Sequence, residues 1–133
     1  MQLLSKLFNQ PDELPETVIH SVNAVQGEAN KILAYALIDL DENRKFCQDW
    51  LVLTDQMLFF VRSDRETNPE SIALSDLKEC ELIEGFTLNR LDLLGKKDNL
   101  LLRVFFTRRQ IRTFSDFSAI LKNLLDEKLD RLH

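Results

Sequence analysis

The middle of the chain, residues 31–107, is a series of short apolar runs joined by short polar turns, and this pattern restricts the fold more than any other feature. The last run alternates Leu100, Leu102, Val104 and Phe106 with other residues, which is the period of a strand whose two faces differ. Parallel strands need crossover connections of about a dozen residues or more, so connections this short predict an antiparallel sheet. We expect seven strands, over residues 32–39, 46–53, 57–61, 71–74, 77–83, 86–94 and 100–107.

Helical patterns precede and follow this series. Two short amphipathic helices are expected in the first 30 residues: one ends before Pro11, and the other lies between Pro15 and Gly27. Their apolar faces carry Leu3, Leu4, Leu7 and Phe8 in the first helix, and Val18, Ile19, Val22 and Val25 in the second. From Arg112 onward, apolar residues recur at spacings of three and four, which predicts a long C-terminal helix. The wide apolar stripe of that helix must cover an open end or face of the sheet.

This order of elements predicts one mainly β domain with a short extension. The 133 residues of the chain suit a single domain. We expect an N-terminal helical extension over residues 1–30, followed by the sheet and its C-terminal helix over residues 31–133.

The composition excludes several classes of protein. The three glycines, Gly27, Gly85 and Gly95, are too far apart to form a phosphate-binding loop. The net charge of -5 gives no overall attraction for nucleic acid. The first residues lack the features of an export signal, and the longest apolar run, Ile32–Ile38, is far shorter than the roughly 20 residues of a membrane span. We therefore expect a cytoplasmic protein that has no nucleic-acid partner and two reduced cysteines, Cys47 and Cys80.

The polar motifs give no sign of catalysis or of metal binding. Asp39, Asp41 and Asn43 mimic the first ligands of a calcium loop, but Arg44 stands where glycine is required and Trp50 where the final glutamate is required. We expect residues 41–43 to form a polar turn between the first two strands instead. An enzyme would need acids that converge in one cleft, for which the candidates are Asp39, Asp41 and Asp55. We expect a protein that is not an enzyme and that holds no cofactor or metal.

One group of basic residues is a candidate binding site for an anion or for the carboxylates of a partner. Three arginines cluster where the last strand meets the C-terminal helix, and two lysines precede that strand. Arginine binds phosphates and carboxylates in a bidentate manner. The alternative is that these residues occupy solvent-exposed turns or pair with acids on the surface. The candidate site residues are Arg108, Arg109, Arg112, Lys96 and Lys97, and Arg103 lies between them in the sequence.

A stretch of about 25 residues resembles a known family. Ala36–Asp41 contains an aspartate-leucine-aspartate turn, Phe46 follows, and the tryptophan-led run Trp50–Asp55 ends in threonine and aspartate before Leu58. These residues, with the preceding Leu14–Glu16, resemble the N-terminal pleckstrin-homology-like segment that some bacterial ABC-type exporters carry ahead of their membrane domain. The resemblance implies a seven-stranded, bent antiparallel barrel that is plugged at one end by the C-terminal helix.

The same resemblance implies a non-catalytic interaction or regulatory module. Its partner would be another protein, a transporter subunit or, through peripheral contact, the inner face of a membrane, and self-association is left open. Phosphoinositide-binding relatives carry basic residues in the first turn, whereas Asp41 and Glu42 lead that turn here, so we do not expect inositol-phosphate binding. The alternative function is a small-ligand carrier, which would need a pocket of about 300 Å³ or more among the expected inward side chains of the barrel, Leu100, Leu102, Val104 and Phe106.

Overall fold

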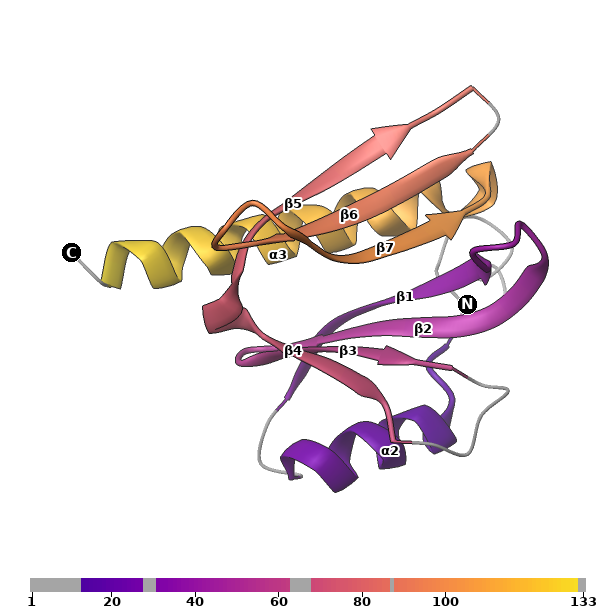
Figure 1. Ribbon diagram of the computed structural model, residues 1–133. Coiled ribbons are helices and arrows are strands. Elements are labelled where there is room, and N and C mark those ends of the chain that lie inside the picture. The colour runs from indigo at the N-terminus through magenta and orange to yellow at the C-terminus, as the bar shows by residue number, and fades with distance from the viewer. Residues whose placement is uncertain (1–12, 28–30, 63–67, 87, 132–133) are drawn as a thin grey trace, which may run out of the picture.

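The computed structural model describes residues 13–27, 31–62, 68–86 and 88–131 (Figure 1). The expected helix with Leu3 and Phe8 lies outside these residues. The described residues form seven antiparallel strands, as predicted, and most begin and end within a residue or two of the expected positions. The elements are α2 (Glu16–Gln26), β1 (Ile32–Leu40), β2 (Phe46–Thr54), β3 (Met57–Val61), β4 (Glu70–Ala73), η1 (Leu74–Asp76), β5 (Leu77–Glu84), β6 (Asn89–Gly95), β7 (Leu100–Phe106), η2 (Arg108–Gln110) and α3 (Ile111–Arg131).

The sheet is bent into two halves and does not close into a barrel. Its strand order is β4-β3-β2-β1-β7-β6-β5. β1 joins the halves through one register pair, Leu40 with Phe105. Among the described residues β4 and β5 are the two edge strands of the sheet, and they do not pair with each other. The 3-10 turn η1 carries the chain from β4, at the edge of one half, to β5, at the far edge of the other. The bend of the expected barrel is thus present, but its strands form an open sheet.

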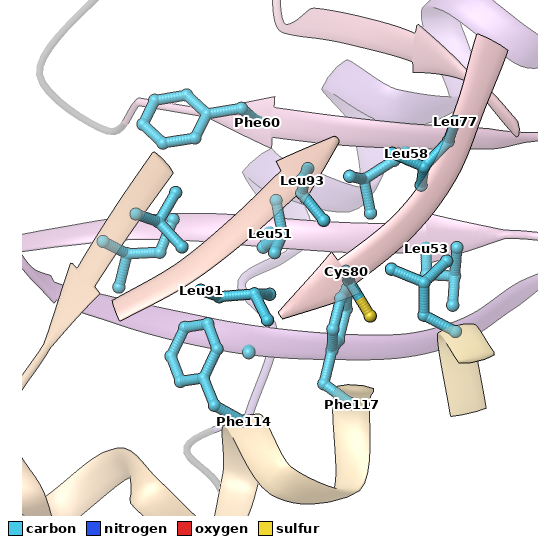
Figure 2. Packing of buried hydrophobic residues seen from close by; sticks show 14 of the residues in the cluster. Leu51, Leu53, Leu58, Phe60, Leu77, Cys80, Leu91, Leu93, Phe114 and Phe117 are labelled. Carbon is cyan, nitrogen blue, oxygen red and sulfur yellow. The ribbon is translucent and has the colours of Figure 1, made fainter. Parts of the chain in front are cut away.

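The main core fills the space between the two halves and is completed by α3, as the apolar stripe of this helix predicted. Phe114 and Phe117 point from α3 toward Leu91 and Cys80 (Figure 2). The ring of Phe114 stacks on that of Phe106, with centroids 4.0 Å apart. Because the side chains of both halves and of α3 interlock here, the hydrophobic gain from burying them stabilises the bend of the sheet.

A second core lies on the opposite face of β1–β3, where α2 packs. Val18 and Val22 of α2 contact a layer that includes Trp50, Val52 and Phe59. Neighbouring residues of a strand face opposite sides, so Phe59 enters this core while Phe60 enters the main core, and both are buried. Gly27 ends α2 with a φ of 90°, which favours glycine.

One expected inward position is wrong. Val104 and Phe106 of β7 are buried and Leu102 is half-buried, but Leu100 is 46% exposed. The register between β6 and β7 shifts between Leu93 and Leu94, which pair with Leu102 and Leu100, and this irregularity interrupts the alternation of β7.

None of the described helices is long and apolar enough to cross a membrane.

Candidate functional site

The predicted basic residues do not form one patch. Lys96 and Lys97 lie in the turn between β6 and β7, whereas Arg108 and Arg109 belong to η2 beyond the other end of β7. The seven residues of β7 separate the two groups, a distance of about 20 Å at roughly 3.4 Å per residue. An anion or a short acidic motif therefore cannot engage the lysines and the arginines together.

Arg103, in the middle of β7, is engaged in an ion pair. Its guanidinium donates hydrogen bonds to both carboxylate oxygens of Asp92, at 2.8 and 3.0 Å, and Arg90 Nε lies 3.2 Å from the same carboxylate. Burial raises the pKa of Asp92, but the hydrogen bonds from Arg103 and Arg90 outweigh it and hold the pKa below the ordinary value of 3.8. Arg103 therefore has a structural partner on the neighbouring strand.

The arginines beyond β7 diverge as well. Arg109 lines a large surface groove, whereas Arg112 lines a separate hollow of about 210 Å³ beside Tyr35, Asp116 and Ile120. Arg108 is exposed. Of the five predicted site residues, Arg109 is thus the one that borders the large groove.

The large groove that Arg109 borders has a volume of about 870 Å³, and we call it the Phe46 groove. Its floor is the side of β1 and β2 on which α2 packs, beyond the start of that helix. Its near wall is the chain just before α2, and its far wall is η2 with the residue preceding it. The lining residues are Glu13, Pro15, Leu37, Asp39, Phe46, Cys47, Gln48, Trp50, Thr107, Arg109 and Gln110. Apolar groups on the floor and polar groups on the wall can hold a segment that presents both kinds of side chain.

The turn between β1 and β2 sets the position of Phe46. Asp41 Oδ1 accepts hydrogen bonds from the backbone N–H groups of Asn43, at 2.8 Å, and Lys45, at 2.9 Å. This confirms the predicted polar turn, and Arg44 has a left-handed φ of 63° within it. β2 then begins at Phe46, which is 85% exposed at the rim of the groove. Exposed apolar side chains mark an interaction surface where they belong to a binding groove, and Phe46 lines such a groove.

Asp39 fixes the far wall of the groove. Its carboxylate accepts a hydrogen bond from the backbone N–H of Thr107, at 2.8 Å, and another from the Thr107 hydroxyl.

Asp55 follows Thr54, which pairs with Ile32 at the opposite end of β1. The three acids that an enzyme would need therefore do not converge. Within the described ranges, no three His, Cys, Asp or Glu side chains gather closely enough to hold a metal ion.

Cys47 offers no activated thiol to the groove. Burial, together with the charge of Asp49, raises the pKa of Cys47 to about 11. Its Sγ donates a hydrogen bond to the carbonyl oxygen of Ile38, at 3.2 Å. Since the thiolate is the nucleophilic form, the raised pKa makes this cysteine a poor nucleophile at neutral pH. Cys80 is buried, and both cysteines are free thiols, as expected.

The groove itself was not predicted. Phe46, Gln48 and Trp50 alternate along β2, so the sequence places them on one face. Pro15 and Gly27 bracket a helix that is too short to cover the whole of that face, and this is the signal from which an uncovered floor could have been inferred.

Comparison with known proteins gives a fold likeness alone. No family model matches the chain, and no curated protein matches it. A solved structure, the C-terminal domain of an unknown protein from Leishmania infantum, superposes with a TM-score of 0.59 at 18% sequence identity, over 83% of this chain and 97% of that one. The arrangement of strands and helix is therefore one that a known protein domain shares.

Proposed function

We propose that the chain is a non-catalytic interaction module of the pleckstrin-homology-like type and that the Phe46 groove binds a segment of a partner protein. The observation that carries the proposal is Phe46, which is 85% exposed beside Trp50 and Leu37 at the rim of a groove bordered by Arg109. The bent seven-stranded sheet with its C-terminal helix supports the pleckstrin-homology-like assignment.

The chemistry of the groove favours one kind of occupant. Phe46 offers apolar contact above the largely buried Trp50, and Arg109 offers a guanidinium that can hold a carboxylate in a bidentate manner. The segment therefore carries an apolar anchor near an acidic side chain. An anionic membrane fits less well, although Phe86 in the turn after β5 is fully exposed. Acidic residues in the neighbouring turns and the net charge of -5 oppose attraction to anionic lipid.

The resemblance to exporter segments indicates where such a partner would lie. Under this proposal the module works in the cytoplasm at the inner face of a membrane, and its partner segment belongs to a transporter. A membrane-spanning region and a nucleotide-binding region are then expected in the same reading frame or in a neighbouring one. Their absence from both would contradict the transporter assignment and leave the groove proposal standing.

A carrier function has less support. Leu51, Leu91 and Leu93 are fully buried in the main core, where they pack against the aromatic side chains of α3. The interior positions that a carrier would use to line a cavity are thus filled by side chains.

Selection of random peptides displayed on phage tests the proposal. Peptides that bind the wild-type protein are expected to combine an aromatic or aliphatic residue with Asp or Glu. Trp50 is the single tryptophan of the chain and lines the groove, so its fluorescence should change on binding. Phe46→Ala and Arg109→Ala should each weaken binding about tenfold, a loss of about 1.4 kcal/mol.

Matched controls exist at the other end of β7. Leu100→Ala removes an exposed apolar side chain and Lys97→Ala removes an exposed cation, and neither residue lines the groove. Both controls should bind the selected peptides like the wild type. Enrichment of no peptide, or of peptides whose binding ignores both Phe46 and Arg109, would overturn the proposal. Sedimentation with anionic vesicles that requires Phe46 and weakens with added salt would replace the protein partner by a membrane.

A further inference from the structure

Strand β5 forms an outer edge of the sheet, and a groove runs along it. Within the described part of the chain, β5 pairs with β6 alone and stands last in the strand order. A groove of about 610 Å³ lies between β5 and the C-terminal half of α3. We call it the β5 groove. Its lining consists of Lys78–Ile83 from β5 and of Lys122, Leu125 and Asp126 from α3.

The lining indicates that this groove follows the edge of β5. Neighbouring side chains of a strand point to opposite faces, so a hollow above one face would be lined by every second residue. Here every residue from Lys78 to Ile83 contributes. The backbone of β5 therefore borders the groove, and the edge of a sheet offers N–H and C=O groups that can pair with a further strand.

The two sides of this edge differ in chemistry. Cys80 and Leu82 contribute to the main core, and Leu125 of α3 packs against the same core. Glu79 and Glu81 occupy the alternate positions and are exposed. An extended segment beside β5 would therefore meet Leu82 and Leu125, flanked by the charged Lys122 and Asp126 of α3, on one side and carboxylates on the other side.

We infer that the β5 groove binds an extended segment of a partner protein in which apolar and basic side chains alternate. The segment adds to β5 as an eighth strand, its apolar side chains facing Leu82 and Leu125 and its basic ones facing Glu79 and Glu81. Opposite charges on adjacent strands stabilise such pairing. The site is independent of the Phe46 groove, with which it shares no lining residue.

A second copy of this chain is a poorer occupant. β5 carries three glutamates, Glu79, Glu81 and Glu84, against one lysine, Lys78. Lys78 is already engaged, with its Nζ 2.6 Å from Asp98 Oδ1. Two β5 strands paired with each other would bring glutamates of both copies close together, and like charges on adjacent strands are destabilising.

A pair of synthetic peptides tests the inference. The first alternates lysine and valine, and the second has the same sequence with a methyl group on every second backbone nitrogen, which removes the hydrogen bonds of one edge. Binding is measured with the whole chain, and hydrogen exchange of the β5 amides is followed with and without each peptide. We expect the first peptide to slow exchange in β5 and to bind at least about tenfold more tightly than the second.

Charge reversal supplies the matched protein variants. The pair Glu79→Lys and Glu81→Lys should weaken the first peptide about tenfold. The pair Asp55→Lys and Glu70→Lys changes the net charge equally at exposed positions outside the groove and should weaken it by less than about twofold. Phe46→Ala should leave this binding unchanged, so failure of the function proposed for the Phe46 groove and failure of this inference are distinguishable.

Three results would overturn the inference. Equal binding of the two peptides would show that charge attraction alone holds them. Slowed exchange outside β5 would place the peptide elsewhere. Slowed exchange of the β5 amides without peptide, together with a dimer whose fraction rises with protein concentration, would make a second copy the occupant.

Discussion

The Asp39 carboxylate in β1 accepts hydrogen bonds from both the backbone N–H and the hydroxyl of Thr107, a residue 68 positions later in the chain. These two hydrogen bonds tie η2 to the β1 strand, and η2 carries Arg109 at the wall of the Phe46 groove. One pair of residues therefore links the stability of the fold to the shape of the candidate site.

Asp39→Ala should destabilise the protein and disturb the groove. The change leaves the half-buried Thr107 N–H without its acceptor, and an unsatisfied group of this kind costs about 1–3 kcal/mol. Asp39→Asn keeps one acceptor oxygen and should cost less. Urea unfolding measures both variants, with the exposed Glu81→Ala as control. A loss below about 0.5 kcal/mol for Asp39→Ala would contradict the linking role of this carboxylate.

The Asp92 pair with Arg103 should make stability fall in acid. The pKa of Asp92 lies below its ordinary value of 3.8 in the folded protein, so the folded state favours the charged form. The resulting stabilisation is present above about pH 4 and disappears as the pH falls through the lower, native pKa.

Arg103→Leu tests this pair by its pH dependence. At neutral pH the variant should lose unfolding free energy, because Asp92 keeps only its contact with Arg90. At about pH 2.5 the difference from the wild type should be smaller, since the charged form of Asp92, with which Arg103 pairs, becomes less populated as the pH falls. Lys96→Ala, an exposed change in the turn next to β7, should show no such trend. A loss that is the same at both pH values would assign the effect to packing of the arginine side chain.

Both cysteines should resist alkylation in the folded protein. Burial raises the pKa of Cys80, and burial with the charge of Asp49 raises that of Cys47 to about 11. At about pH 8 the thiolate fraction is then small, and iodoacetamide should modify the native chain far more slowly than the chain in urea. Intact mass spectrometry follows both reactions. Rapid modification of Cys47 in the native state would mean that the thiol is more acidic and more accessible than its surroundings indicate.

The strands and helices were predictable because their signals are local. A two-residue connection at Asp55 and Gln56 joins β2 to β3, the alternation near Phe59 and Phe60 assigns one aromatic ring to each face, and the apolar stripe beginning near Phe114 gives α3. Each of these patterns lies within one continuous stretch of the chain, the longest being the 21 residues of α3.

The candidate site was not predictable in the same way because it depends on contacts between distant segments. The hydrogen bonds from Thr107 to Asp39 bring η2 against β1. Because α2 begins only after Pro15, it does not cover the start of β2, and Phe46 stays exposed. The separation of Lys97 from Arg108 follows from the length of β7, which its sequence already indicated. The sheet does not close because η1 leads the chain away from β4. No residue pattern in Leu74–Asp76 predicts this change of direction.

The contact of α3 with the sheet gives the prediction with the largest expected effect. Phe114 is fully buried and stacks on Phe106, so Phe114→Ala removes the aromatic pair and leaves a cavity between the helix and both halves of the sheet. Substitutions of this type cost about 3–5 kcal/mol. Ile120→Ala removes an apolar side chain from the same helix at a position that is 40% exposed, and it should cost less than about 1 kcal/mol. Thermal unfolding with calorimetry measures both variants. If the two losses were equal, the helix would contribute to stability through its own helical structure, and the packing of Phe114 against the bent sheet would not be what holds the two halves together.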